Sequence, residues 1–194
     1  MAEVAKIVWQ GGTMLAPTPA VLVSCGDGSR KPRNLVTVAW CGTVCTDPPQ
    51  LSISLRPERY SYGIIRELGE FVVNVPPVSL AAAVDSCGVV SGRTVDKFAR
   101  YGLTPQTAST LATPLVAECP INLECKVERI IELGSHHLFI ARIAAVDVDA
   151  ALVDGAGRFD AARADLLGYV HGHYRRLGEE LGRFGFSVRK EAKA

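Results

Sequence analysis

Two short stretches of the chain, residues 35–45 and 51–56, combine small polar side chains with one arginine. Both are rich in β-branched and apolar residues, which predicts strands whose side chains alternate between two faces. An ordinary solvated strand face has long charged side chains among its threonines. Here the faces opposite the bulky residues have only small side chains before Arg56: Thr37, Ala39, Cys41 and Thr43 on the first strand, Ser52 and Ser54 on the second.

Such faces could hold a flat ligand with an anionic group at one end. Small side chains let a planar ring approach the backbone, and Arg56 could neutralise the anion through a bidentate pair. Five residues on, Ser61 is expected to cap a helix over residues 61–68, whose N-terminus would suit a phosphate. A ring and a phosphate together describe flavin mononucleotide (FMN). The alternative is an exposed sheet face with a solvated Arg56 and a simple helix cap.

Most of the chain reads as short strands separated by proline and glycine. Six strands at close spacing predict one mainly β domain, a barrel with peripheral helices. One or two short helices are expected within residues 79–101, and a helix followed by a glycine-rich tail from residue 160. The expected strands cover residues 20–24, 35–45, 51–55, 71–75, 121–133 and 138–148.

Composition excludes several classes of protein. The 21 basic and 20 acidic residues give a net charge of +1, unlike the basic excess typical of nucleic-acid binders. No apolar stretch approaches the roughly 18 residues that a membrane span needs. The first residues have no continuous apolar region typical of a signal peptide. We therefore expect a cytoplasmic protein with neither membrane nor nucleic-acid partners.

The six cysteines are expected to be reduced thiols that pack in the core. No Cys-x-x-Cys pair or nearby histidine suggests a metal site. Cys41 and Cys45 would lie roughly 13 Å apart along a regular strand, too far for a disulfide unless a bulge brings them together. His171 and His173, two residues apart, make a poor metal pair. We predict no bound metal.

The run NLVTVAWCGTVCTDPPQLSISLRPERYSYGIIRELGEFVVNVP, residues 34–76, closely resembles the FMN-binding split-barrel flavin reductase family. Its AWCGTVCTDPP segment is most similar to the flavoredoxin branch. Later segments fit as well: VDKFARYGL at 95–103, LECKV at 123–127, GSHHLFIARI at 134–143 and the tail HYRRLGEELGRFGFSVRK. The resemblance therefore extends over nearly the whole chain.

The resemblance implies a homodimer of six-stranded split barrels, each a single domain over residues 1–194 that holds one noncovalent FMN near the interface. Residues 160–194 would pack on the partner or over the flavin site, through Tyr169, Tyr174, Phe184 and Phe186. Trp40 would lie beside the flavin ring, although strand alternation also allows a place in the core. The implied FMN-binding residues are Thr37, Val38, Ala39, Trp40, Thr43 and Cys45 along the strand, with Ser54, Arg56, Ser61 and Lys97 in polar and phosphate-binding roles.

The implied activity passes electrons from NAD(P)H or a protein donor through FMN to flavin, a ferric chelate or a redox partner. His136 matches a Gly-Asp-His turn near the nicotinamide donor, but this chain has Ser135 where the family has the acid. The missing acid leaves open an electron carrier without its own NAD(P)H site. A third alternative is a split barrel with haem or no cofactor, against which Arg56, Ser61 and Lys97 favour a phosphate.

Overall fold

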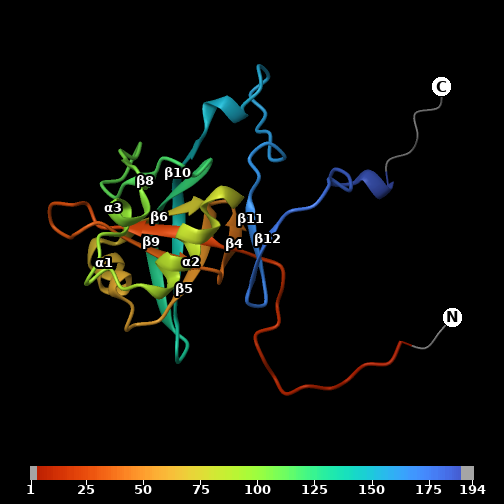
Figure 1. Cartoon of the computed structure of the whole chain (residues 1–194), viewed down its shortest axis with the longest axis horizontal. Coiled ribbons are helices and arrows are strands. Elements are labelled where there is room, and N and C mark those ends of the chain that lie inside the picture. Colours follow the sequence, from red (N-terminus) through yellow and green to blue (C-terminus); the bar gives the residue numbers. More distant parts are fainter. Residues whose placement is uncertain (1–3, 189–194) are drawn as a thin grey trace.

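The computed structural model describes residues 4–188 and is built around a seven-stranded sheet, with neighbouring strands in the order β3-β2-β6-β9-β10-β5-β4 (Figure 1). All its pairings are antiparallel. β9 and β10 are the longest strands and form a hairpin in the middle of this order. The strands are β2 (Val21–Cys25), β3 (Asn34–Val38), β4 (Cys41–Thr46), β5 (Pro49–Leu55), β6 (Glu70–Val75), β9 (Ile121–Glu132) and β10 (His137–Val148).

The two edges of this sheet belong to one stretch of chain. β3 pairs with β2, and after a bend at Ala39 and Trp40 the chain continues as β4, which pairs with β5. The amide of Ser54 donates to the carbonyl of Trp40 at 2.9 Å, so β5 also holds the bend itself. With β3 and β4 counted as one bent strand, the sheet has the six strands that the sequence predicts. It curls into an open, split barrel, so the predicted fold class is confirmed.

The bend corrects the prediction of one regular strand over residues 35–45. Regular alternation would place Trp40 on the same face as Val36 and Val38, which are both 4% exposed. Trp40 is 45% exposed instead, because the chain changes direction at this residue to leave β2 and join β5. A second irregularity follows between Thr43 and Cys45, where β4 has a bulge opposite β5.

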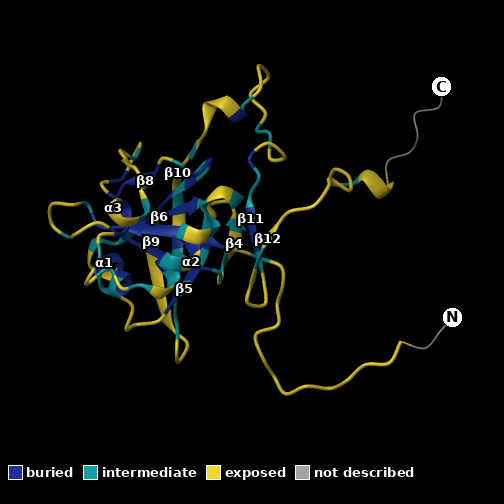
Figure 2. Ribbon diagram, viewed as in Figure 1, coloured by how far each residue is buried: buried dark blue, intermediate teal, exposed yellow. Residues whose placement is uncertain are grey.

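The barrel interior holds the main hydrophobic core. Val21 and Val23 of β2, Ile53 of β5, and Phe139 of β10 are at most 2% exposed within it. Leu22 points to the opposite side of β2, into a second core that α2 (Ala81–Val89) and α3 (Lys97–Tyr101) cover. β2 is therefore buried on both faces, as the dark central strands of Figure 2 illustrate.

Helix α1 (Tyr60–Leu68) follows β5 after a short turn and packs its apolar side into the barrel core. Ile64 and Ile65 share the buried side of this helix. Arg59 is the N-cap residue and its side chain makes no capping hydrogen bond, so the prediction of Ser61 as the cap is wrong. Ser61 lies one residue inside the helix and is 1% exposed, because its hydroxyl accepts a hydrogen bond from the buried Asn34 side chain at 2.8 Å.

The C-terminal region corrects a second prediction, since residues 160–176 form turns and a hairpin rather than a helix. β11 (Leu167–Val170) and β12 (His173–Arg176) pair around His171 and Gly172, whose φ values of 44° and 88° are those of a two-residue hairpin turn. β1 (Thr18–Pro19) adds a third strand to this sheet. The remaining elements are η1 (Val78–Leu80), β7 (Pro105–Gln106), β8 (Leu115–Val116), η2 (Ala150–Leu152) and η3 (Phe186–Val188).

The hairpin packs on its own barrel. Tyr169 and Tyr174 contact each other with ring centroids 5.4 Å apart and pack, partly buried, against the second core. That they also cover a partner or the flavin site stays a prediction. Phe184 and Phe186 remain exposed on the extended C-terminal segment (Figure 2). Residues 189–194 of the predicted tail lie outside the described residues. Within residues 4–188, no helix is long and apolar enough to cross a membrane.

Candidate functional site

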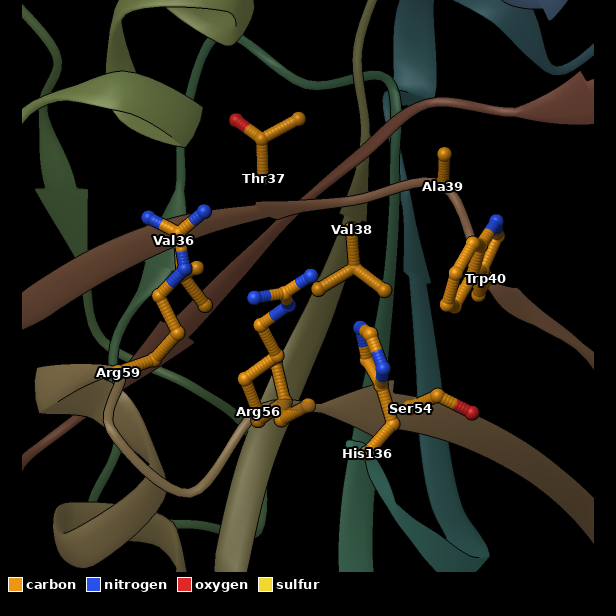
Figure 3. Close-up of a pocket in the computed structure, with 10 residues that line it drawn as sticks. Val36, Thr37, Val38, Ala39, Trp40, Ser54, Arg56, Arg59 and His136 are labelled. Atoms are coloured by element: carbon orange, nitrogen blue, oxygen red, sulfur yellow. The ribbon is translucent and has the colours of Figure 1, made fainter. Parts of the chain in front are cut away.

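A cavity of about 140 Å³ opens at the bend between β3 and β4; we call it the bend cavity (Figure 3). The bend brings the small residues of one bent strand opposite the end of β5 and the turn before β10. Figure 3 shows side chains from all these segments, with Arg56 and Arg59 on one side and Trp40 with His136 on the other. Its lining residues are Val36, Thr37, Val38, Ala39, Trp40, Ser54, Leu55, Arg56, Arg59 and His136.

Trp40 and His136 form one wall of the bend cavity. Their ring centroids lie 4.5 Å apart with the ring planes tilted by 49°. The hydroxyl of Ser135 lies 3.0 Å from His136 Nδ1, within hydrogen-bonding distance. Burial lowers the pKa of His136, and the positive charge of Arg56 lowers it further. The imidazole is therefore predominantly neutral at pH 7, with its orientation restrained by Ser135 and Trp40.

A second cavity, of about 240 Å³, adjoins the first at Val36, Arg56 and Arg59, which line both; we call it the cationic cavity. It lies between the start of β3, the N-terminus of α1 and the segment before α3. Its other lining residues are Asn34, Glu58, Tyr60, Ser61, Val90, Ser91, Gly92 and Lys97. The first N–H groups of α1 have no partners within the helix, and the helix dipole favours an anion there.

Three of the lining residues, Arg56, Arg59 and Lys97, are basic and one, Glu58, is acidic. Glu58 pairs with Arg56 at 3.3 Å. Arg59 donates to the carbonyl of Gly88 at 2.9 Å, and no carboxylate within residues 4–188 pairs with Arg59 or Lys97. The cavity thus has two more positive than negative groups, which matches the charge of a phosphate monoester, about −1.5 to −2 at pH 7.

Lys97 is the most deeply buried of these cations, at 3% exposure. Its ammonium donates to the carbonyls of Leu35 and Cys87, both at 2.7 Å, so two of its three N–H groups hold β3 and α2 together. Burial lowers the pKa of Lys97. Asn34 and Gly92 complete this wall: a Cβ atom on Gly92 would lie only 2.0 Å from the Asn34 side-chain oxygen, so the close approach requires glycine.

A family model described as a flavin reductase like domain matches residues 13–178, well over half of the chain. The chain belongs to the flavin reductase-like family. The resemblance of residues 34–76 to this family is therefore confirmed.

Solved structures of the flavin reductase-like family superpose over nearly the whole chain. The flavoredoxin of Desulfovibrio vulgaris (Miyazaki F) is 33% identical, with a TM-score of 0.87 over 95% of this chain and 99% of that chain. A flavoredoxin from Methanosarcina acetivorans is 27% identical, with a TM-score of 0.85 over 96% and 100%. An uncharacterised protein of Archaeoglobus fulgidus is 35% identical over 128 residues, 66% of this chain and 72% of its own.

The structure brings most of the residues predicted from this family into the two adjoining cavities. Thr37, Val38, Ala39, Trp40, Ser54, Arg56 and His136 line the bend cavity, while Ser61 and Lys97 line the cationic cavity with Arg56. Thr37 is tied to α2, since its hydroxyl donates to the carbonyl of Val84. Arg59 lines both cavities and was not predicted, although its position two residues before the expected helix was a usable signal.

Two predicted residues lie elsewhere. Thr43 lines a more apolar groove along β4, which adjoins the bend cavity at Ala39, Trp40 and Ser54 and is also lined by Leu15 and Thr18 of the N-terminal segment. Cys45 lines neither cavity, and its thiol contacts the carbonyl of Asp47 at 3.4 Å. The bend and the bulge together turn β4 away from the two cavities, so Thr43 and Cys45, which the resemblance implied, do not line them.

The cysteines, all within the described residues, are free thiols. Burial raises the pKa of Cys41 to about 12 and that of Cys25 also to about 12. Both are therefore protonated and poorly nucleophilic at neutral pH. Within residues 4–188, no group of three His, Cys, Asp or Glu side chains is placed to hold a metal ion.

Proposed function

We propose that the two cavities together bind one FMN and that the chain is an oxidoreductase of the flavin reductase and flavoredoxin type. The observation on which the proposal depends is the pair of adjoining cavities: small side chains, Trp40 and His136 in one, and an excess of positive charge in the other. The related solved structures, two flavoredoxins and an FMN-binding protein from Thermus thermophilus, support the same cofactor.

The residues present fit a flavin phosphate. Arg59 and Lys97 are cations without a carboxylate partner in the described part of the chain, and Ser61 adds a hydroxyl at the N-terminus of α1. A phosphate would supply the missing negative charge. Arg56 can take part after exchanging its 3.3 Å contact with the exposed Glu58, a pair of little intrinsic stability.

The bend cavity would receive the isoalloxazine ring, which supplies the redox chemistry when FMN is bound. Val38 and Ala39 present short side chains and let the ring reach the backbone, while Trp40 adds aromatic contact. His136 is neutral at pH 7, so it can orient a donor by hydrogen bonding without exchanging a proton.

We favour NAD(P)H as the electron donor because His136 lies in the wall of the bend cavity and Ser135 restrains its ring. The alternative is an electron carrier that receives electrons from a redox protein. Ser135 in place of the acid expected before His136 favours that alternative. The acceptor would be free flavin, a ferric chelate or a protein partner in either case.

An absorption spectrum followed by anaerobic titration tests this proposal. The purified protein should take up FMN with bands near those of a bound oxidised flavin, and addition of NADH or NADPH should bleach them. A protein that takes up FMN but is not reduced by either nucleotide is the carrier. A protein that binds no FMN overturns the proposal.

We also propose a homodimer whose interface lies beside the bend cavity. Trp40 and Val44 are exposed on the edge strand β4, next to the apolar groove that Leu15 lines. Monomeric proteins rarely expose so many large apolar side chains, which makes the chain ends candidates for packing on a second copy. The exposed residues of these ends are Val4, Ile7, Val8, Trp9, Met14 and Leu15, with Leu177, Leu181, Phe184, Phe186 and Val188.

A further inference from the structure

A basic surface lies on the outer side of α1, beyond the cationic cavity. Two cavities that share Pro32 and Arg93 form it, one of about 780 Å³ along α1 and one of about 500 Å³ beside the start of α3. The loop between β2 and β3 also contributes, and Figure 1 shows this loop and α1 on the same side of the barrel. The basic residues of this surface are Arg30, Lys31, Arg33, Arg59, Arg66 and Arg93.

The basic surface concentrates positive charge in a chain that is nearly neutral. Its six basic residues are accompanied by two acidic ones, Glu67 and Asp96, so its net charge is +4, against +1 for the whole chain. The rest of the chain is therefore net acidic. A local excess of one charge steers an oppositely charged partner toward one face of a protein.

Four of the six cations are available to a partner. Within residues 4–188, no carboxylate lies within 4.0 Å of the guanidinium groups of Arg33, Arg59, Arg66 or Arg93. Arg33, Arg66 and Arg93 are also exposed, and they line neither cavity of the proposed flavin site. These three groups are therefore free to pair with the carboxylates of another molecule.

The side chains among these cations suit contact with a protein. Pro32, Pro57 and Tyr60 line the cavity along α1, and the guanidinium of Arg93 lies 5.4 Å from the ring centroid of Tyr60, a cation–π distance. Arginine and tyrosine are among the residues enriched in protein interfaces. Nucleic-acid binders have a clear basic excess over the whole domain, which this chain lacks. A protein with an acidic patch is therefore a better partner for this surface than a nucleic acid.

The basic surface adjoins the proposed flavin site through Arg59. This residue lines the bend cavity, the cationic cavity and the cavity along α1. A protein docked on the basic surface would therefore contact a residue of the cavity that would receive the flavin ring. This position is suitable for a partner that exchanges electrons with the flavin.

We propose that the basic surface docks an acidic electron-transfer protein that accepts electrons from the reduced flavin. This inference rests on the proposed function and deepens it, because it gives the protein acceptor a docking surface and a charge. Two oxidised one-electron carriers would each gain one electron from one reduced FMN, and the two protons of the reduced ring would pass to water.

Two oxidised c-type cytochromes, one of net negative and one of net positive charge, are the probes that test this inference. In calorimetric titration of the FMN-loaded chain at low salt, the acidic cytochrome should bind at least about tenfold more tightly than the basic one. Addition of salt to about 0.3 M should weaken this binding at least about tenfold, because exposed charge pairs are screened. After anaerobic reduction of the bound FMN, haem absorbance should show faster reduction of the acidic cytochrome.

Arg66→Glu combined with Arg93→Glu should weaken binding of the acidic cytochrome at least about tenfold, since two attractive charge pairs become repulsive. Arg129→Glu combined with Arg163→Glu is the matched control. It changes the net charge of the chain equally, but both arginines are exposed and line none of the cavities of the flavin site or the basic surface. Cytochrome binding by the control, and FMN affinity in both double variants, should change less than about threefold.

The outcomes separate this inference from the proposed function. A chain that binds FMN but not the acidic cytochrome overturns the inference alone. Equal weakening by the two double variants also overturns it, because the net charge of the chain and not this surface then determines binding. Tighter binding of a double-stranded DNA than of the acidic cytochrome assigns the surface to nucleic acid and overturns it too. Failure to bind FMN overturns the proposed function and, with it, this inference.

Discussion

At the scale of single residues, His136 decides whether the chain acts as a reductase or as a carrier. Its ring lies 4.5 Å from Trp40, and Ser135 lies 3.0 Å from its Nδ1. Burial lowers the pKa of His136, and the positive charge of Arg56 lowers it further, so the ring is predominantly neutral at pH 7. The residue is placed to orient a donor, and it makes no contact with the cationic cavity where the phosphate would bind.

His136→Ala should slow the reduction of bound FMN by NADH or NADPH by a factor of order 10², because orientation effects are of this size. FMN affinity should be retained. Stopped-flow absorbance measures the first quantity and fluorescence titration the second. Ser135→Ala is a matched variant and should show a smaller loss of the same kind. If the flavin of the His136→Ala variant is reduced as fast as that of wild type, His136 is only a residue of the turn and does not orient the donor.

At the scale of elements, the sequence was sufficient to predict that two residues line the same cavity where those residues lie close together in the chain. Arg56 and Ser61 are five residues apart across one turn, so their convergence on one cavity follows from the strand and helix that flank them. Lys97 came from the resemblance alone, because nothing local indicates that α3 returns to β3. Thr43 and Cys45, also taken from the resemblance, line neither cavity, because a bend and a bulge, which result from pairing with two different strands, interrupt regular alternation.

The C-terminal hairpin was missed for a related reason. Residues 160–176 contain good helix formers, but positive φ values at Asp165, His171 and Gly172 end any helical path, and tertiary pairing with β1 determines the outcome. Local propensity is a weak guide where a partner strand lies far away in the sequence.

A buried carboxylate holds the loop before β8 onto β9. Glu124 is fully buried and accepts hydrogen bonds from Ser109 N at 2.6 Å and from the backbone and hydroxyl of Thr110 at 2.8 and 2.6 Å. Burial opposes its charged form, but the hydrogen bonds from Thr110 and Ser109 outweigh burial and lower its pKa. Burial raises the pKa of the neighbouring Asp147, and Glu124 raises it further.

Glu124→Gln should therefore lower the free energy of unfolding by about 2 kcal/mol at pH 7. A lowered folded-state pKa stabilises the fold above the ordinary value of 4.5, and this contribution is lost as the pH falls through the folded pKa. The gap between wild type and variant should accordingly shrink below pH 4.5. Urea unfolding across this range measures it. Glu128→Gln, an exposed neighbour on β9, is the control; a gap that widens in acid would contradict the assignment.

At the scale of the whole molecule, one chain buries its own barrel core but leaves apolar side chains near both of its termini exposed. Residues 4–17, before β1, and residues 177–188, after β12, extend from the barrel (Figures 1 and 2) and have exposed apolar side chains. Trp40 links these surfaces to the bend cavity, since it lines both the cavity and the apolar groove along β4. A second copy would thus cover the edge of the proposed flavin site.

Light scattering at micromolar concentration should give twice the chain mass of 20.7 kDa. Trp40→Ser combined with Val44→Ser should shift the equilibrium toward monomer, because both apolar side chains would be buried in the interface. Val146→Ser, an exposed apolar residue of β10, is the matched control. A wild-type mass of 20.7 kDa would exclude the dimer under these conditions.

The central claim is that the cationic cavity recognises the phosphate of a flavin, and comparison of FMN with riboflavin tests it most directly. Wild type should bind FMN at least about thirtyfold more tightly than riboflavin, since charged hydrogen bonds of about 1.5–3 kcal/mol each are available only to FMN. Arg59→Gln should reduce this ratio while leaving riboflavin affinity unchanged. Equal affinity of wild type for FMN and riboflavin, measured by calorimetric titration, would contradict the account.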